Sequence, residues 1–437
     1  MDLTSTLIMM QANVPGFVPT GLGFISELTL TTGHPGTRRV SIDDVRLDSS
    51  NNIYLVGNQN NGGYATAYLA KLNNSGAMQW QKRFTYYSGY QNGSLSRLAY
   101  DGTDLYATGQ VHASTIVIKF NTSGSVSWYR RLDNAAGGRG IKYDGGDLYI
   151  TTSDYPDGIR YFRLNTSGTS QQEKNYDDTN VSFIDAFNSD VNGSGQTFVS
   201  FYSYSGGTRP VLLKHDYNGS KLWAKEINPG SGEYGYFQGV AVDSSSNAYV
   251  AGGYRSSSNS VQHPYIAKFN NSGTIQWQRD LTVSSSGGTF TNITIDGSNN
   301  IFVVGKNVFG SGTNDEEMLL AKYNSSGTLQ WQRTLRHATD RVNLYSITHQ
   351  GSSLYMTGIL YDTSSYYKGL VIRLPDDGSL TGTYGDYTYA SSSFSTGSPS
   401  YTYQNNAVAA INQSIGSNQE YGFPPTNESH SNTVEPL

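Results

Sequence analysis

Short runs of alternating apolar and polar residues recur along most of the chain. Four of them follow one another closely: GVAVD (239–243), AYVAG (248–252), YIAKFN (265–270) and TIQWQRDL (274–281). Only Ser, Asn and Gly turns or a polar loop separate them. A two-residue alternation predicts half-buried strands, and no segment keeps the 3.6-residue period of an amphipathic helix. The pattern therefore predicts four consecutive antiparallel strands.

This four-strand unit occurs seven times. The glycine of its last turn recurs at intervals of 44 to 54 residues, at Gly76, Gly124, Gly168, Gly219, Gly273, Gly327 and Gly378. Five positions before it stands a base: Lys71, Lys119, Arg163, Lys214, Lys268, Lys322 and Arg373. Four positions after it stand all five tryptophans, Trp80, Trp128, Trp223, Trp277 and Trp331, while the third and seventh copies have Gln172 and Gly382. A second base follows six positions after the glycine in every copy except the last.

Four antiparallel strands repeated every ~40–50 residues are typical of β-propeller blades. We therefore predict an all-β fold: a seven-bladed β-propeller of four-stranded antiparallel blades over residues 24–390, with extended N- and C-terminal arms at 1–23 and 391–437. A spare strand at about 24–30 is expected to close the ring on the last blade, because unpaired sheet edges are sticky. The first strand of each blade is expected to line a central channel through Val45, Leu47, Leu98, Tyr100, Val240, Val242, Ile293 and Ile295.

The repeat also resembles a known family. The pattern D-x-x-x-N-x-Y-x-x-G, followed by K-[FLY]-N-x-x-G-x-x-x-W, is similar to the SBBP-type β-propeller repeat, as in Asp243, Asn247, Tyr249, Gly252, Lys268 and Trp277. The resemblance covers about five-sixths of the chain and is weakest in the third and seventh copies. Because this repeat family has no single activity, the resemblance implies the fold alone.

The last copy, Arg373–Ser393, is similar to the endings of structural and tail-associated proteins of marine tailed bacteriophages, cyanophages especially. This resemblance implies a virion protein. The polar segment after the ring has two open interpretations: an unstructured tail, or an arm that orders on a neighbouring subunit. Within it, Asn405–Ile415 is compatible with a short helix, which Pro424 and Pro425 would end.

Composition narrows the function classes. Charged residues are 14% of the chain and the net charge is −5, with no run of Lys or Arg, so a nucleic-acid partner is not expected. No apolar run approaches ~18 residues, so no membrane span is expected. Without cysteine there is no disulfide or thiolate ligand, and the start MDLTSTLIMMQANVPG lacks the basic residues of a secretory signal. The composition thus suits the outside of a cell, although no export signal is recognised.

The sequence gives little indication of catalytic or metal-binding residues. The seven histidines recur at no fixed blade position, so no catalytic residue, metal or cofactor is predicted. Aspartates do recur at the end of first strands, at Asp48, Asp101, Asp144, Asp243 and Asp296. The following DSSNN and DGSNN segments lack the acidic ladder and final Glu of a calcium loop. We interpret these aspartates as turn formers that hydrogen-bond the backbone two residues on.

The repeated bases and tryptophans have two interpretations. A ring of bases could bind acidic glycans or nucleic acid, or each long side chain could cover a blade face while its charged end pairs with a carboxylate or carbonyl. Their presence in nearly every copy favours a structural role for Lys71, Lys119, Lys268 and Lys322, and a blade-to-blade packing role for Trp80, Trp128, Trp223, Trp277 and Trp331.

The loops that differ between copies remain as binding candidates, because variable loops on a rigid scaffold carry recognition. Tyr with Ser, Gly and Asn makes an adaptable contact surface for sugars or proteins. The candidate residues are Tyr86, Tyr87, Tyr90, Tyr155, Tyr202, Tyr204, Tyr254, Tyr366 and Tyr367.

We therefore expect a non-enzymatic virion structural protein of a tailed phage, associated with the tail or fibre and made in the host cytoplasm. Its expected partners are other virion proteins in a symmetric assembly and a host surface glycan. The alternative is a bacterial surface or exported adhesin or lectin that binds glycans. A polysaccharide-cleaving propeller would need a converging set of carboxylates or of His, Tyr and Arg, which the sequence does not indicate.

Overall fold

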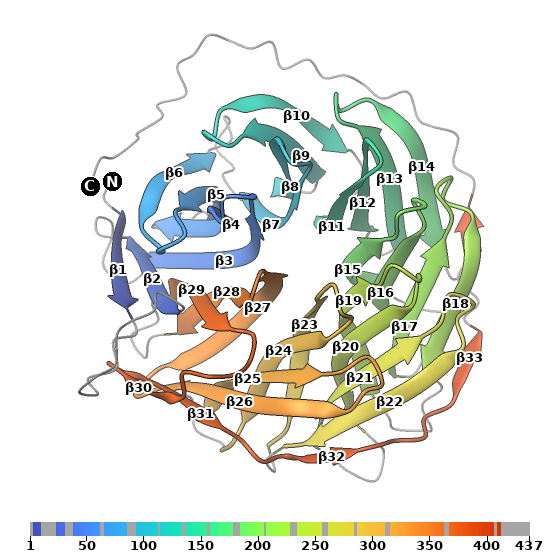
Figure 1. Ribbon diagram of the computed structural model, residues 1–437. Coiled ribbons are helices and arrows are strands. Elements are labelled where there is room, and N and C mark those ends of the chain that lie inside the picture. The colour runs from blue at the N-terminus through green and yellow to red at the C-terminus, as the bar shows by residue number, and fades with distance from the viewer. Residues whose placement is uncertain are drawn as a thin grey trace.

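A computed structural model describes residues 3–9, 23–30, 38–61, 65–84, 93–111, 114–132, 137–154, 158–177, 184–204, 207–227, 234–255, 261–283, 286–310, 315–361, 367–405 and 409–411. These residues form strands and turns arranged as blades around a central axis, a β-propeller (Figure 1). None of them forms a helix long and apolar enough to cross a membrane.

Six runs of four antiparallel strands follow the chain, each with its strands in sequence order. They are blade 1, β3 (Arg38–Leu47), β4 (Ile53–Asn61), β5 (Ala65–Leu72) and β6 (Met78–Phe84); blade 2, β7 (Gly93–Tyr100), β8 (Asp104–Val111), β9 (Ser114–Asn121) and β10 (Val126–Leu132); blade 3, β11 (Gly138–Asp144), β12 (Asp147–Asp154), β13 (Gly158–Asn165) and β14 (Ser170–Asp177); blade 4, β15 (Ile184–Val191), β16 (Thr197–Tyr204), β17 (Thr208–His215) and β18 (Lys221–Ile227); blade 5, β19 (Tyr234–Val242), β20 (Ala248–Arg255), β21 (His263–Phe269) and β22 (Ile275–Thr282); blade 6, β23 (Gly288–Ile295), β24 (Ile301–Val308), β25 (Glu316–Tyr323) and β26 (Leu329–His337).

Blade 7 is built from both ends of the chain. Its first three strands are β27 (Arg341–Gln350), β28 (Ser353–Tyr361) and β29 (Tyr367–Pro375). The fourth place, beside β29, is taken by β2 (Phe24–Leu30), the segment expected to close the ring. β1 (Leu3–Met9) pairs with β2 as a fifth strand, so part of the N-terminal arm belongs to this sheet. The pairing is consistent with the seven blades that the repeat predicts.

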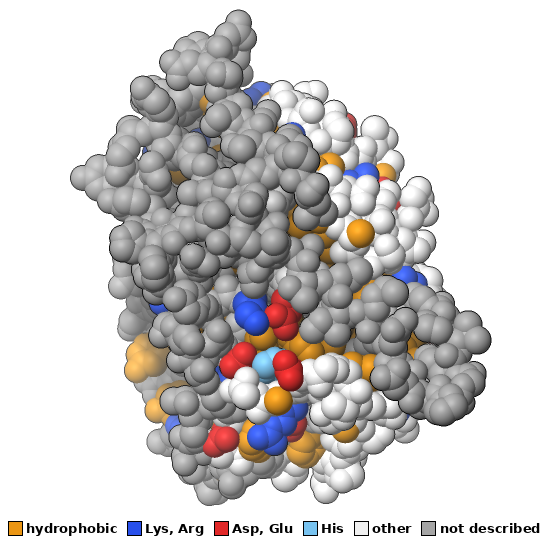
Figure 2. Space-filling model, turned by 90° about the vertical axis from the view of Figure 1, so that its left-hand side faces the viewer, with side chains coloured by type: hydrophobic (Ala, Val, Ile, Leu, Met, Phe, Trp, Pro, Cys, Tyr) orange, Lys and Arg blue, Asp and Glu red, His pale blue; other side chains and the backbone are white. Residues whose placement is uncertain are grey.

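The closing strand is fixed by a network of polar side chains around Glu27, which is buried. Glu27 accepts hydrogen bonds from Lys368 Nζ of β29 at 2.9 Å and from the Tyr387 hydroxyl at 2.8 Å. On this side of the molecule, acidic and basic side chains gather around a histidine among hydrophobic groups (Figure 2). The two donors satisfy this buried carboxyl group, which thereby ties β2 both to blade 7 and to the chain beyond it.

The chain after blade 7 becomes a belt around the ring. It supplies β31 (Tyr387–Ser391) to the outer edge of β26, after the short β30 (Gly382–Tyr384). It then supplies β32 (Ser395–Gly397) to β22, β33 (Tyr403–Asn405) to β18 and β34 (Ala409–Ile411) to β14. Blades 6, 5, 4 and 3 thus each gain an outer strand, and Figure 1 shows this orange-to-red segment following the rim.

The belt corrects two expectations for the C-terminal arm. The helix considered at Asn405–Ile415 is absent from the described residues there, because Asn405 and Ala409–Ile411 pair with the free backbone groups of outer strands. The described part of the arm also lies along outer strands of its own ring, which neither open interpretation of this segment included. Tyr403 of this arm packs its ring against Phe269 at 4.9 Å between ring centres.

The core lies between blades. Each hydrophobic cluster combines side chains of two adjacent blades, such as Val117 of blade 2 with Ile150 and Phe162 of blade 3. Burying these apolar faces is the main favourable free energy that holds one blade against the next. The ring is therefore a series of such layers, arranged around a polar centre.

All seven inner strands carry a β-bulge at the same place. The register with the second strand shifts between Ile42 and Asp44 in β3 and at the matching positions of β7, β11, β15, β19, β23 and β27. A bulge inserts one residue and changes which face the following side chains occupy. It therefore decides which residues reach the centre of the ring.

Candidate functional site

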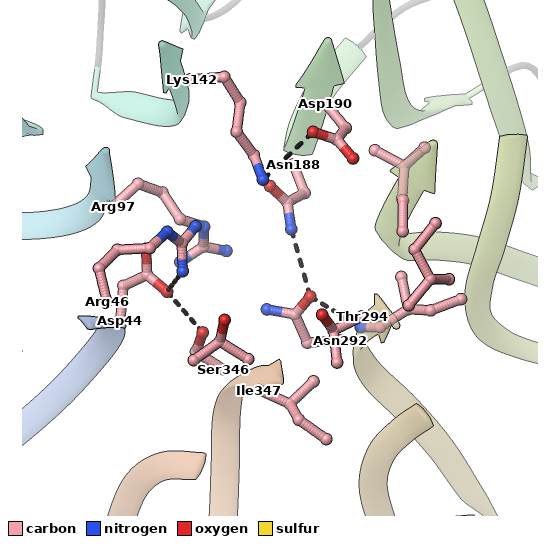
Figure 3. Close-up of a pocket in the computed structure, with 15 residues that line it drawn as sticks. Asp44, Arg46, Arg97, Lys142, Asn188, Asp190, Asn292, Thr294, Ser346 and Ile347 are labelled. Carbon is pink, nitrogen blue, oxygen red and sulfur yellow. Dashed lines mark hydrogen bonds and ion pairs between the residues drawn. The ribbon is translucent and has the colours of Figure 1, made fainter. Parts of the chain in front are cut away.

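All seven inner strands contribute to a cavity of about 180 Å³ at the centre of the ring (Figure 3). Its lining is mainly polar and charged, and comprises Asp44, Arg46, Arg97, Lys142, Asn188, Asp190, Val240, Ala241, Asn292, Ile293, Thr294, Ile295, Ser346, Ile347 and Thr348. The expectation of an apolar lining is therefore only partly right. Val240, Ile293 and Ile295 reach the cavity, whereas Val45 and Leu98 are fully buried in the core.

Most of the polar groups in the cavity bind one another. Asp44 accepts from Arg46 Nη1 at 3.1 Å and from Ser346 Oγ at 2.5 Å, which joins blade 1 to blade 7. Lys142 Nζ lies 3.2 Å from Asp190 Oδ1, between blades 3 and 4. Figure 3 shows these contacts as dashed lines. The charges therefore act mainly as cross-links between inner strands.

Two half-buried groups near the cavity, Asp43 and Arg97, have shifted pKa values. Burial raises the pKa of Asp43 to about 6, although the hydrogen bond from Ser41 and the charge of Arg97 oppose the rise. Burial also lowers the pKa of Arg97, whose guanidinium donates to the carbonyls of Ser96 and Phe187 at 2.8 and 3.3 Å. The arrangement can bind a small polar solute. Within the part of the chain that the structure describes, no three acidic, histidine or cysteine side chains converge to hold a metal ion.

The recurring aspartates act in turns. Asp243 Oδ1 accepts from the backbone N–H of Ser245 at 2.9 Å and of Asn247 at 2.8 Å, and Oδ2 accepts from the Tyr249 hydroxyl at 3.0 Å. Asp48 and Asp101 are arranged in the same way with Tyr54 and Tyr106. The carboxylate thus fixes the turn and anchors a tyrosine of the second strand, as turn chemistry predicts.

The first repeated base lies over the ring of that second-strand residue. Lys268 Nζ is 4.9 Å from the centre of the Tyr249 ring, and Lys71 and Lys119 lie 5.1 and 5.3 Å from the Tyr54 and Tyr106 rings. Lys322 lies 4.9 Å from Phe302, which replaces the tyrosine in blade 6. Cation–π contacts of this kind hold the base within its own blade face.

The tryptophans bind the last turn of the following blade. The indole N–H donates to a turn carbonyl in four cases: Trp80 to Thr122 at 3.3 Å, Trp128 to Thr166 at 3.0 Å, Trp223 to Asn271 at 3.0 Å and Trp277 to Ser325 at 3.1 Å. In blades 1, 2, 5 and 6 the second base donates to the glycine carbonyl of the same turn, as Arg279 does to Gly327 O at 2.9 Å. Trp331 packs on the core between blades 6 and 7. These side chains therefore join neighbouring blades.

The seventh copy lacks tryptophan for a topological reason. After its turn the chain leaves blade 7 and becomes β30 and β31 of the belt, so Gly382 is not in an outer strand of blade 7. The N-terminal β2 fills that place. The ring closure and the irregular last copy thus have one cause.

The loop candidates are only partly described. Tyr86, Tyr87, Tyr90, Tyr155 and Tyr366 lie outside the described residues. Tyr204 ends β16 with 44% of its surface exposed, Tyr202 is half-buried beside Phe187, and Tyr367 stacks under Arg39 at 4.6 Å. The expectation that Tyr254 is an exposed loop residue is wrong. It lies inside β20 and is 2% exposed, because Tyr401 of the belt covers its ring at 3.8 Å.

Sequence reasoning missed the belt-binding residues. Gln278 and Gln332 each follow the tryptophan of their blade, and their Nε2 atoms donate to belt carbonyls, to Tyr401 O at 3.0 Å and to Phe394 O at 2.8 Å. The only available signal was the repeated Gln after Trp in QWQ, which alternation alone attributes to an exposed strand position.

Blades around an axis, a closing strand from the opposite end of the chain and a central polar cavity define a β-propeller protein. No model of a protein family matches the sequence, and no curated protein matches it. Solved structures with a similar fold include YCF48 bound to D1 peptide, with 14% identity, TM-score 0.47, and coverage of 79% of this chain and 94% of that chain. A second is Sqt1 from Chaetomium thermophilum, with 8% identity, TM-score 0.42, and coverage of 77% of this chain and 96% of that chain. A third is the polysaccharide lyase Uly1, with 8% identity, TM-score 0.48, and coverage of 77% of this chain and 90% of that chain.

Likeness at this level concerns the fold alone. It does not decide between catalysis and binding.

Proposed function

We propose that the chain is a non-enzymatic structural protein of a tailed-phage virion, associated with the tail or fibre. The observation that carries this proposal is the belt, which adds outer strands to blades 6, 5, 4 and 3. An added strand covers an edge that would otherwise pair with other chains, so the ring becomes a rigid body with defined contact points. Such a body serves a particle that must survive outside a cell.

The contacts of the repeated residues support the assignment of the ring as a structural scaffold. The aspartates fix turns, the first bases cover aromatic rings, and the tryptophans and second bases join blades. The loops that differ between blades remain for docking to other virion proteins, as binding loops on a rigid scaffold do. The similarity of Arg373–Ser393 to phage tail-associated endings supports the same assignment.

The test is mass spectrometry of purified virions. We expect peptides of this chain to co-purify with tail or fibre proteins at a fixed ratio through two successive density gradients. Absence of the chain from particles that contain all other tail proteins would overturn the proposal. An unrelated protein made in the same host cell, followed through the same gradients, controls for carry-over.

One observation favours glycan binding as a second candidate function. Tyr204 and Tyr234 are 44% and 39% exposed, and they lie at the same end of adjacent blades 4 and 5. Exposed aromatic rings supply stacking surfaces for sugars. A glycan array with the isolated chain tests this function: binding that Tyr204→Ala and Tyr234→Ala abolish, with folding intact, would favour the lectin.

A further inference from the structure

The central cavity has room for more than a single ion. Its volume of about 180 Å³ is roughly six times the ~30 Å³ that one water molecule occupies in the liquid. The lining residues named above come from the inner strands of all seven blades, so the cavity lies where the whole ring converges. Its size therefore suits a small organic molecule, and the lining groups decide which kind.

The two carboxylates of the lining already accept most of the hydrogen bonds that they can accept. Besides the two contacts described above, Asp44 accepts from the Leu98 backbone N–H at 2.8 Å. Asp190 accepts from the backbone N–H groups of Val191 at 3.0 Å and Val242 at 2.9 Å, in addition to its ion pair with a lysine. Because a carboxylate has about four lone-pair sites, neither group has much capacity left for a ligand that donates.

The three bases of the lining, in contrast, keep hydrogen-bond donors. Arg97 uses one hydrogen of Nη1 and one of Nη2 for the carbonyls of Ser96 and Phe187, so each nitrogen keeps a second hydrogen. Among the described residues, Arg46 makes both of its hydrogen bonds through Nη1. Lys142 has three N–H groups and one ion-pair partner in the cavity. Free donors therefore outnumber free acceptors, which favours a ligand that accepts hydrogen bonds.

The charge of the lining also favours an anion. Three bases and two carboxylates line the cavity, which gives it one excess positive charge in a chain whose net charge is −5. Asp43 acts on Arg97 from outside the lining, but burial raises its pKa to about 6, so it is neutralised more readily than an ordinary carboxyl group. A guanidinium binds a carboxylate through two parallel N–H groups. A molecule with one carboxylate thus matches the excess charge.

Hydroxyl groups complete the lining, at Thr294 of blade 6 and Thr348 of blade 7. In Figure 3, Thr294 lies on the other side of the cavity from Arg97 and Lys142. We propose that the central cavity binds a small hydroxycarboxylate of about six carbon atoms. Its carboxylate accepts hydrogen bonds from Arg97 and Lys142, and its hydroxyl groups bind the two threonines. This site goes beyond the proposed function and does not depend on it.

The probe is gluconate, titrated against the full chain by calorimetry. Sorbitol has the same carbon chain and hydroxyl groups but no carboxylate, so we expect gluconate to bind and sorbitol not to bind. Arg97→Gln and Lys142→Gln should each weaken gluconate binding about tenfold, through the loss of a hydrogen bond from a charged group. Thr348→Val should weaken it about threefold, through the loss of a neutral one. Arg336→Gln changes an exposed base of the outer strand β26, so it is the matched control and should have no effect.

Equal affinity for gluconate and sorbitol would overturn the proposal, because the bases would then play no part. Gluconate binding that both Arg97→Gln and Lys142→Gln leave unchanged would place the ligand outside the cavity and would also refute it. Tighter binding of inorganic phosphate than of gluconate would contradict the hydroxycarboxylate as the ligand class. The melting temperature of each variant is measured first, and Lys142→Gln, which alters a single ion pair, tests the site even where Arg97→Gln does not fold. Absence of the chain from virions would overturn the proposed function and leave this result unchanged.

Discussion

The boundary between blades 5 and 6 and the boundary between blades 3 and 4 solve one problem with different residues. In the first, Trp277 and Arg279 bind the carbonyls of the Ser325–Gly327 turn. In the second, Gln172 replaces the tryptophan, and the Tyr176 hydroxyl donates to Gly219 O at 2.7 Å. What the ring requires is therefore a donor for the turn carbonyl and a large group beside it, and not tryptophan as such.

His215 completes the boundary between blades 3 and 4. Its ring is fully buried, 4.3 Å from the centre of Tyr161 and 5.3 Å from that of Tyr176. The Tyr161 hydroxyl donates to Tyr217 O at 3.0 Å, a second contact across the same boundary. His215, Tyr161 and Tyr176 thus supply the packing and hydrogen bonding that one tryptophan supplies at other boundaries, and they bring a titratable group into the core.

Among the variants that test this comparison, Trp277→Ala should have the largest effect on stability. It removes the packing and the hydrogen bond between blades 5 and 6, and should lower the free energy of unfolding by about 3–4 kcal/mol. Urea denaturation followed by circular dichroism measures this. Gln172→Ala, at the same position of blade 3, is the matched control and should cost under ~1 kcal/mol. Equal losses in the two variants would contradict the assigned roles.

Acid should weaken the boundary between blades 3 and 4 through His215, while the raised pKa of Asp43 acts in the opposite direction over part of the same pH range. Burial lowers the pKa of His215 from 6.5 to about 4. Between these values the unfolded chain binds more protons, so stability is complete above pH 6.5 and is lost as pH falls toward 4, by about 2–3 kcal/mol. Because Asp43 titrates in both chains, the loss is measured as the difference between the native chain and His215→Phe in the change of unfolding free energy from pH 7 to 4.5. An unchanged pH dependence in His215→Phe would refute the assignment.

Gly327→Ala should cost about 2 kcal/mol, because alanine is strained at a positive φ. The residue has φ 76°, and a Cβ would lie 2.7 Å from the Trp277 ring. Gly351→Ala is the matched control, with φ 64° and open space around the Cβ, so it bears only the backbone cost of about 1 kcal/mol. Thermal unfolding of both variants measures the difference. Equal destabilisation by Gly327→Ala and Gly351→Ala would show that the Trp277 indole does not restrict the side chain at position 327.

Tyr176→Phe should have the smallest effect, about 1 kcal/mol, from the loss of one hydrogen bond to Gly219 O. Hydrogen exchange of amides in the 216–220 turn should rise, while exchange in the 324–328 turn of blade 6 stays as before. Faster exchange in both turns would mean that the change is global and not confined to this boundary.

The sequence predicts the blades well because their signals are local. The turn glycines, such as Gly273 with φ 78°, and the capping Asn270 mark each hairpin within five residues. The spare strand 24–30 is visible because it is one strand too many before the first repeat. These features need no knowledge of what lies across the ring.

The cavity lining could not be read in the same way. The bulge between Ile42 and Asp44 breaks the alternation, so a two-residue period carried through β3 assigns Val45 to the channel when it is buried. The roles of Gln278 and Tyr401 also escaped prediction, because their contact joins residues more than a hundred positions apart. Nothing in the local pattern distinguishes a strand edge that will receive the belt.

The belt has a consequence for biosynthesis. Because β31 to β34 follow every blade in the chain, a ribosome makes them after the strands that they cover. Until then the outer edges of β26, β22, β18 and β14 are open, and β2 waits, unpaired with its blade, for β29 to emerge. Domains generally fold as units during synthesis, with the N-terminal parts first. In this chain, one segment made after blade 7 covers the outer edges of four blades, so those edges stay open until translation has passed blade 7.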